Sequence, residues 1–125
     1  MSAADPGRSV PPTIPDEIAC SLESCGGIAG LREQLPAEGD LEQRSRELRA
    51  CADPIRLKIL AMLFRGPLCV CVIRAVLDIA DSKLSYHLSV LKKVGFITGE
   101  QQGNWIIYRL TDRGRERASV IFSGS

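Results

Sequence analysis

The stretch SYHLSVLKKVGFITGEQQGNWIIYRLT, residues 85–111, decides the fold that we predict for this chain. At its start, Leu88 and Leu91 continue an apolar stripe from Leu84 at helical spacing, and Gly95 is the residue type that ends a helix. Its second half alternates aromatic and β-branched residues around a polar, glycine-containing turn, which is typical of a β-hairpin. We therefore predict a helix that is followed directly by a hairpin.

The sequence around this stretch adds short helices and no internal repeat. Their signals are N-cap side chains and apolar residues at helical spacing. The predicted helices cover 41–52 after Asp40, 54–64 after Asp53, 71–78, 82–93 after Asp81 or Ser82, and 112–122. A short helix, a tight turn, a second helix and a hairpin form a winged helix-turn-helix. The predicted fold class is mainly α with a small β-hairpin.

Length and charge limit the classes of protein that fit. A chain of 125 residues favours one domain with a tail. Residues 1–40 hold two Arg and seven Asp or Glu, a net charge of −5, while residues 41–125 hold fourteen Lys or Arg and eight Asp or Glu, a net charge of +6. A basic body favours an anionic partner such as nucleic acid. An ordinary solvated surface remains the alternative, because this charge is mild.

The N-terminal region carries neither a basic start nor an apolar signal-peptide stretch, and no run of eighteen apolar residues occurs. We therefore expect a cytoplasmic protein whose five cysteines stay reduced. Four prolines within residues 1–15 predict disorder, and Gly26–Gly27 divides 16–35 into short helical pieces. The predicted domains are a flexible, partly disordered arm over 1–39 that carries Cys20 and Cys25, and a winged helix-turn-helix domain over 40–122.

The helix over 82–93 turns a polar face away from its leucines. Short hydroxyls, a tyrosine and a lysine can reach base edges and phosphates, and further cations add salt-dependent phosphate contacts. Ser85 and Tyr86 are the best candidates for base contact. The candidate DNA-binding residues from this reasoning are Ser82, Lys83, Ser85, Tyr86 and Ser89 on the helix face, with Lys92, Lys93 and Arg109 for phosphates.

Three motifs together resemble the ArsR/SmtB family of metal-responsive repressors: ADPIRLKIL (52–60), LCVC (68–71) and the stretch at 85–111. The resemblance implies a homodimer whose interface is formed by the helices near 41–51 and 112–122. It also implies that the helix over 82–93 enters the major groove and that the hairpin touches the duplex, for which Gln102 and Asn104 are the candidates. The implied function is a repressor that an inducer releases from operator DNA.

LCVC places two thiols one residue apart. Free cysteine fills cores as a small hydrophobe, while thiolates bind soft ions. Successive helical residues turn by about 100°, so Cys69 and Cys71 do not face each other on a helix. One ion can take both sulfurs only where the chain is extended or where a helix begins to fray. Cys71 shares its helical face with Ala75 and Asp78, which favours a ligand over core packing.

The ion class follows from the donor atoms. In the family that the chain resembles, zinc- and nickel-type members use a histidine-rich site on the last helix, and residues 112–122 have no histidine. The resemblance therefore implies that sulfur holds any ion, which favours Cd(II), Pb(II), Zn(II) or As(III). Resemblance to the family's cadmium/lead sensors implies that the arm of one protomer reaches the LCVC helix of the other. The candidate metal ligands are Cys69 and Cys71 with Cys20 and Cys25 of the arm, while Cys51 is expected in the core and kept as a further thiolate for As(III).

Two other interpretations of the same fold stay open. Exposed cysteines oxidise readily, so the thiols also fit a redox switch. A winged helix can also bind a protein partner without reading a specific DNA site. No nucleophile–base pair, phosphate loop or carboxylate pair is recognisable, so we predict no enzymatic activity and no organic cofactor. His87, at the edge of the apolar stripe, is expected to be structural.

Overall fold

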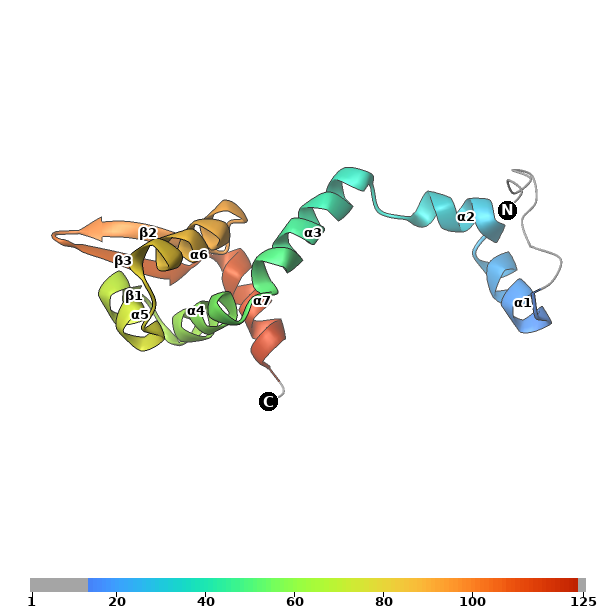
Figure 1. The fold of residues 1–125 in the computed structure, drawn as a ribbon. Helices are drawn as coiled ribbons and strands as arrows, with labels where there is room; N and C mark the ends of the chain where they lie inside the picture. Colours follow the sequence, from blue (N-terminus) through green and yellow to red (C-terminus); the bar gives the residue numbers. More distant parts are fainter. Residues whose placement is uncertain (1–13, 124–125) are drawn as a thin grey trace. The chain divides into compact units, whose positions relative to one another are not determined.

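The computed structural model describes residues 14–123, so the disorder predicted for residues 1–15 falls almost entirely outside the described residues. The elements of the described part are shown in Figure 1. They are α1 (Asp16–Ser24), α2 (Gly27–Gln34), α3 (Glu38–Cys51), α4 (Pro54–Arg65), β1 (Leu68–Cys69), α5 (Val70–Leu77), α6 (Asp81–Lys93), β2 (Ile97–Gln102), β3 (Trp105–Leu110) and α7 (Asp112–Phe122).

Contacts within the chain divide it into two units, and the division falls between Leu41 and Glu42. In the first unit, α1 contacts α2. Gly26 and Gly27 separate these helices with φ angles of 89° and 78°, a region that glycine adopts without steric cost. The predicted break between two short helices is therefore confirmed.

Helix α3 begins earlier than predicted. The expected N-cap at Asp40 is wrong, because the helix already starts at Glu38 and only residues 35–37 separate it from α2. Both Glu38 and Asp40 lie in the first turn, where the helix dipole stabilises carboxylates. The helix buries Glu47, Ala50 and Cys51 and leaves Leu48 58% exposed.

The second unit packs its helices and sheet around one apolar core. Helix α4 starts as predicted, because the Asp53 carboxylate accepts the backbone N–H groups of Ile55 and Arg56 at 2.8 and 3.1 Å. The fully buried large side chains are Phe96, Ile59, Leu60, Leu63, Ile73, Leu91 and Ile97. These residues come from α4, α5, α6, the turn before β2 and the first residue of β2, so the core holds the helix-turn-helix against the sheet.

Helix α6 has the predicted inner stripe, since Leu84, Leu88 and Leu91 are all buried. Its predicted N-cap at Asp81 or Ser82 is wrong: Ala80 takes that position without a side-chain hydrogen bond. Asp81 lies in the first turn instead, where its Oδ1 is 3.1 Å from Nη1 of Arg74 in α5.

The end of α6 is confirmed at Gly95, whose φ is +81°. The N–H of Phe96 donates to the Leu91 carbonyl at 3.0 Å, and the N–H of Gly95 donates to the Lys92 carbonyl at 2.9 Å. This is the Schellman arrangement that stops helices with a left-handed residue. It turns the chain directly into β2.

The hairpin is confirmed, and a third strand joins it. Strand β3 pairs antiparallel with β2 on one side and with β1 on the other. The sequence predicted only two strands, because β1 has two residues and no alternating pattern. In Figure 1 the β2–β3 hairpin runs out beside α6 and its tip projects beyond the helices of this unit.

Helix α5 is less buried than its sequence pattern indicated. Of its apolar residues, Ile73 is fully buried, whereas Val72 and Val76 are exposed. Asp78 then adopts a left-handed conformation with φ of 52° and ends the helix before α6. Short polar side chains such as aspartate tolerate this region better than branched ones.

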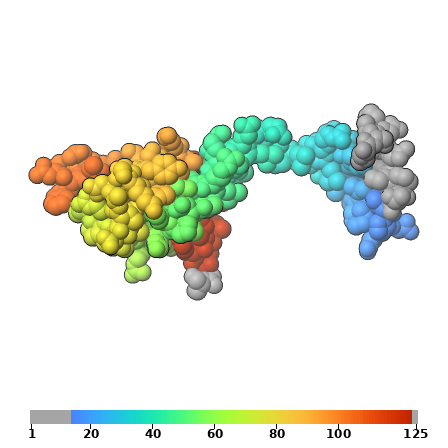
Figure 2. Space-filling view, in the orientation of Figure 1, coloured from blue at the N-terminus to red at the C-terminus, as the bar shows by residue number. Residues whose placement is uncertain are grey.

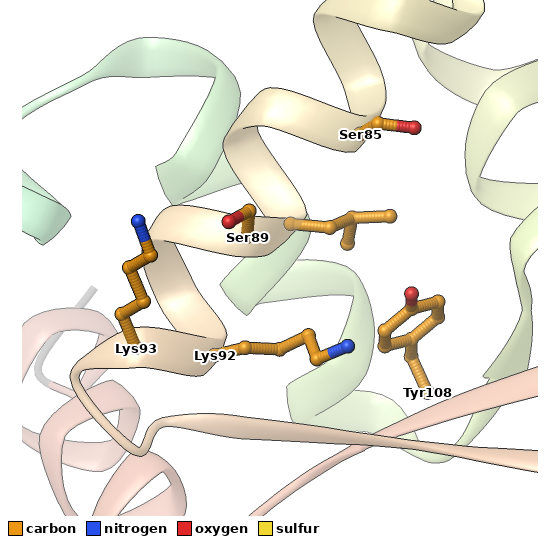
Figure 3. A pocket seen from close by; sticks show the side chains of 6 residues that line it. Ser85, Ser89, Lys92, Lys93 and Tyr108 are labelled. Atoms are coloured by element: carbon orange, nitrogen blue, oxygen red, sulfur yellow. The ribbon is translucent and has the colours of Figure 1, made fainter.

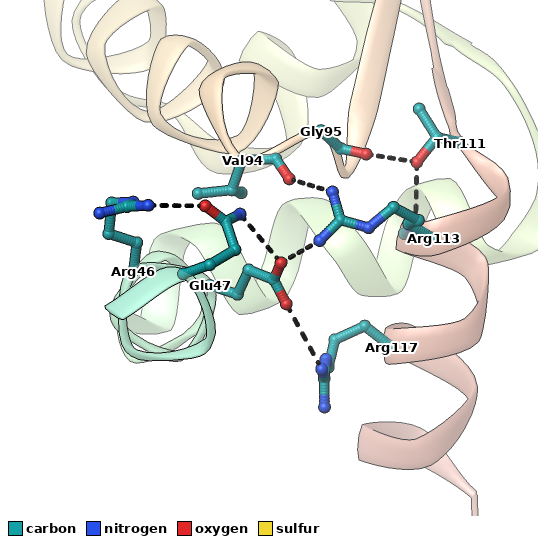
Figure 4. Close-up of polar contacts among 9 residues, drawn as sticks. Arg46, Glu47, Val94, Gly95, Thr111, Arg113 and Arg117 are labelled. Carbon is teal, nitrogen blue, oxygen red and sulfur yellow. Dashed lines mark hydrogen bonds and ion pairs between the residues drawn. The ribbon is translucent and has the colours of Figure 1, made fainter. Parts of the chain in front are cut away.

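A buried carboxylate joins α3 to α7. Glu47 is 4% exposed, accepts a hydrogen bond from Gln43 at 3.0 Å, and pairs with Arg113 and Arg117 of α7 (Figure 4). The Gln43 hydrogen bond comes first among the causes that lower the pKa of Glu47, followed by the two arginine charges, while burial opposes them. The carboxylate is therefore held charged and ties the first long helix to the last.

Candidate DNA-binding surface and thiol pair

The polar face of α6 is open to solvent. With the leucine stripe turned into the core, the residues predicted to meet DNA lie on the outside of the helix. Ser89 is half-buried, and the exposed members are Ser82, Lys83, Ser85, Tyr86, Lys92 and Lys93. The arrangement places hydroxyl, phenol and ammonium groups along a single exposed helix, as major-groove recognition requires.

A hollow of about 410 Å³ lies between this face and the central strand β3 (Figure 3). It is lined by Ser85, Leu88, Ser89, Lys92, Lys93 and Tyr108. In Figure 3 the Lys92 side chain points toward the Tyr108 ring, whereas Lys93 points away from it. The Lys92 Nζ atom is 6.0 Å from the ring centroid. Tyr108 is a site residue that the sequence reasoning missed.

The wing tip is polar and carries one large aromatic side chain. Gln102 and Asn104, the predicted wing contacts, are exposed beside the Gly103 turn. Trp105 follows them and is 57% exposed, although nothing in the sequence reasoning singled it out. The hairpin, orange in Figure 2, forms an edge of the second unit. The predicted phosphate contact Arg109 pairs with Glu100 across the hairpin at 3.6 Å.

His87 holds α6 against the start of α4. It is 5% exposed, and Arg56 Nη1 donates to its Nδ1 at 2.8 Å. Burial lowers the pKa of His87, and the positive charges of Arg56 and Lys83 lower it further, while Asp53 at 3.9 Å opposes them. The ring is therefore a neutral acceptor, in agreement with the structural role that we predicted. Arg56, which also donates to the Ala50 carbonyl at 2.7 Å, is a second residue that the sequence reasoning missed.

The two LCVC thiols converge. Cys69 is the last residue of β1 and the N-cap of α5, with φ of −67° and ψ of 144°, so its backbone is extended. Its Sγ lies 2.7 Å from the Sγ of Cys71 and also accepts the Cys71 N–H at 3.4 Å. This meets the condition set by the sequence, that the chain be extended where two sulfurs share one ion.

The hydrogen bond between the two thiols shifts their pKa values in opposite directions. The bond from the Cys71 thiol lowers the pKa of Cys69, and backbone N–H groups and the Arg74 charge act in the same direction. The same bond raises the pKa of Cys71. Both residues are half-buried and free. The pair therefore loses its first proton readily and offers a thiolate to an electrophile or a soft ion.

The thiol pair is also joined to the wing strand. In the antiparallel register, Leu68 lies opposite Tyr108 and Cys69 lies opposite Ile107. Cys69 is therefore paired with β3 and is also the N-cap of α5. The sequence could not show this link, because it joins segments far apart in the chain.

The other cysteines lie in different surroundings. Cys20 is exposed on α1, and Cys25 is half-buried at the C-cap of that helix, where its carbonyl accepts the Gln34 side chain at 3.2 Å. Cys51 belongs to the core as predicted, and burial raises its pKa. Among the described residues, no three or more His, Cys, Asp or Glu side chains are grouped so as to hold a metal ion. The four-thiol set that includes the arm thus stays a prediction.

Comparison with known proteins agrees with this architecture. The family described as "Bacterial regulatory protein, arsR family" matches residues 53–98. The chain is 40% identical over 73 residues to the arsenical resistance operon repressor of Bacillus subtilis (strain 168), a match that covers 58% of this chain and 70% of that protein. It is 38% identical over 81 residues to the transcriptional repressor SmtB of Mycobacterium tuberculosis (strain ATCC 25618 / H37Rv), covering 65% of this chain and 56% of that one.

Solved structures share the fold. HlyU from Vibrio cholerae N16961 superposes with a TM-score of 0.63 at 26% identity, over 68% of this chain and 94% of that one. A winged helix-turn-helix DNA-binding domain from Mycobacterium bovis, described as homodimeric, superposes with a TM-score of 0.63 at 23% identity, over 70% of this chain and 85% of that one.

Fold and surface together define a mainly helical winged helix-turn-helix domain with a small antiparallel sheet. The chain belongs to the ArsR/SmtB family. It is a DNA-binding regulator from a family of repressors, and it is not an enzyme. Within residues 14–123, no helix combines the length and the apolar character needed to cross a membrane.

Proposed function

We propose that the chain is a homodimeric repressor that binds operator DNA and leaves it when a thiophilic ion binds the thiolates of Cys69 and Cys71. The observation that carries this proposal is the approach of the two sulfurs to 2.7 Å at the N-cap of α5. The inducer is a soft ion, Cd(II), Pb(II), Zn(II) or As(III), because the side-chain donors that converge there, within the part of the chain that the structure describes, are sulfurs. Relatives whose names refer to arsenical resistance support a metalloid inducer, and the relative named as the transcriptional repressor SmtB supports repression.

Dimerisation is supported by apolar side chains that the second unit leaves uncovered on α3 and α7. Leu48 of α3 and Val120 and Ile121 of α7 are exposed, although such residues usually lie in a core or an interface. The Glu47 network holds these two helices together. The related fold described as homodimeric supports the same assembly.

DNA binding rests on two parts of the second unit. Helix α6 enters the major groove, with Ser85 and Tyr86 against base edges and the two lysines at its C-terminal end against phosphates. The wing adds contacts from Gln102 and Asn104 to the backbone or the minor groove. A dimer presents two such helices to half-sites about one helical turn apart, which tolerates little change in their spacing.

Release follows from where the thiols lie. An ion bound by Cys69 and Cys71 constrains the first turn of α5, which the Arg74–Asp81 ion pair joins to the start of α6, and also β1, which pairs with β3 of the wing. Ion binding therefore changes the surroundings of both helix α6 and the β2–β3 wing. Cys20 and Cys25 of the partner's arm complete the ligand set in this proposal. Coupling of this kind amounts to about 1–3 kcal/mol, or about 5- to 150-fold in affinity.

The experiment that tests the proposal is a titration of the reduced protein with Cd(II) and, separately, with arsenite. An operator duplex is first obtained by selection from a random pool, and its affinity is followed by fluorescence anisotropy together with thiolate-to-ion absorption. We expect absorption to rise with stoichiometric ion while DNA affinity falls. Unchanged affinity at saturating Cd(II), Pb(II), Zn(II) and arsenite would refute ion sensing. Failure to select any duplex would favour a winged helix that binds a protein partner.

A thiol redox switch is the second candidate function. The 2.7 Å approach of the sulfurs also favours it, because oxidation by a peroxide removes two protons and two electrons to form one S–S bond. The structure described as "Reduced HlyU" supports it among the solved relatives at 26% identity. Loss of two thiols and of DNA affinity under mild hydrogen peroxide, reversed by dithiothreitol and without ion uptake, would identify this mechanism.

A further inference from the structure

The hollow between α6 and β3 brings together donors from two elements that are distant in the chain. Its wall from α6 carries Ser85, Ser89 and Lys92, and its wall from the wing strand carries Tyr108. Among the described residues that line it there is no carboxylate: its polar groups are three hydroxyls, which can donate hydrogen bonds, and the ammonium groups of Lys92 and Lys93. Such a set fits an anion with several acceptor oxygens.

The Tyr108 ring is held firmly in this wall. The residue is 8% exposed, and its strand neighbours are Gly99 on β2 and Leu68 on β1. A Cβ atom at Gly99 would come within 2.8 Å of the ring, so glycine makes room for it. Packing alone would accept phenylalanine at this position. In Figure 3 the amino group of Lys92, on the α6 wall, points toward Tyr108, on the β3 wall.

We propose that this hollow seats one phosphodiester of the bound duplex, held jointly by the Lys92 ammonium and the Tyr108 hydroxyl. The inference rests on the proposed function in that it needs DNA on this face. It goes further, because it makes Tyr108 a DNA contact and gives α6 and the wing a shared phosphate. A phosphate contact positions the protein on the duplex without reading sequence. The seat therefore sets the angle between the recognition helix and the wing.

The test is a double-mutant cycle on the reduced, ion-free protein with the selected operator duplex. We expect Tyr108→Phe to weaken binding by about tenfold with no change in salt slope, because it removes a neutral donor to a charged group. Lys92→Gln should weaken binding and lower the slope of log affinity against log salt by about one. Because both side chains hold one phosphate, the double variant should lose less than the product of the single losses.

Matched variants separate this seat from general electrostatics. Lys58→Gln removes one exposed charge from α4, outside the proposed surface, and should leave affinity nearly unchanged. Pairing Tyr108→Phe with Lys83→Gln, at the other end of α6, should give multiplicative losses. Thermal unfolding of Tyr108→Phe should match that of the wild type, since the ring remains.

Two results would overturn the proposal while the regulator itself still binds DNA. One is a Tyr108→Phe protein with wild-type affinity. The other is a multiplicative Tyr108 and Lys92 cycle. A third arm uses inorganic phosphate at constant ionic strength: phosphate that binds the wild type but not Tyr108→Phe, and that does not compete with DNA, would make the hollow a site for a free anion rather than for the duplex. A wild-type protein that binds no duplex would refute the proposed function instead.

Discussion

The two cysteine pairs of this chain, Cys69 with Cys71 and Cys20 with Cys25, differ in their spacing along the chain and in the backbone conformation that carries them. Cys69 and Cys71 have one residue between them, across a strand end and a helix start, and their sulfurs lie 2.7 Å apart. Cys20 and Cys25 lie within and at the end of one helix, and no hydrogen bond joins their side chains among the described residues. Backbone conformation, more than distance along the chain, decides which thiols can share an ion.

The comparison predicts its largest effect for Cys69→Ser. This change removes one of the two converged sulfurs, so the ion-induced loss of DNA affinity, about 5- to 150-fold in coupled systems, should disappear. Anisotropy of the operator duplex with and without Cd(II) measures it. Affinity in the absence of ion should stay at the wild-type value. A variant that no longer binds DNA at all would show instead that the thiols are structural.

A smaller effect is expected when both arm cysteines are replaced. The Cys20→Ser, Cys25→Ser protein keeps the pair that is joined to α5 and β3, so saturating ion should still release DNA. Ion affinity should fall on the order of tenfold, because the ligand set is incomplete. Competition with a chromophoric chelator measures this affinity. An unchanged ion affinity would show that the arm cysteines are not ligands. Complete loss of ion-induced DNA release would show that release needs both cysteine pairs.

The alkylation rates of Cys69 and Cys71 are expected to differ by a few-fold. The lowered pKa of Cys69 means that its thiolate persists to lower pH, whereas the raised pKa of Cys71 keeps that thiol protonated. Iodoacetamide should therefore alkylate Cys69 about two- to tenfold faster than Cys71 near pH 7.5, followed by mass spectrometry. In Cys71→Ala the hydrogen-bonding thiol is removed, so Cys69 should be alkylated more slowly than in the wild type. Equal rates in the wild type would contradict the assigned hydrogen bond.

A cysteine-to-serine change at Cys51 should affect the stability of the fold and not the release of DNA. Cys51 is buried in the core, so Cys51→Ser places a hydroxyl among apolar groups and should lower the free energy of unfolding by about 1 kcal/mol. Urea denaturation measures the loss. Release of DNA by Cd(II) and by arsenite should persist. If Cd(II) still releases DNA from this variant and arsenite does not, Cys51 is a thiolate ligand for As(III).

Much of the fold was predictable because its signals are local. The leucine stripe of α6, the Gly95 stop and the polar hairpin turn each act over a few residues and were confirmed. The N-cap predictions at Asp40 and at Asp81 or Ser82 were wrong, because acidic residues are also stabilised within the first helical turn. At the site, the exposed face of α6 was found, while Tyr108 and Arg56 were missed. Their partners lie in other elements, so no spacing in the sequence marks them.

The sequence by itself determined the winged helix and the donor atoms available, because hydrophobic spacing, turn residues and side-chain chemistry are properties of short segments. Only the tertiary structure decided where those atoms meet. Cys69 stays extended because its strand pairs with β3 beside Ile107, and this pairing turns its sulfur toward Cys71. Tyr108 faces the lysine of α6 because the same strand is packed between two others. Such pairings depend on contacts between segments that are distant in the sequence, and the spacing of residues along the chain does not show these contacts.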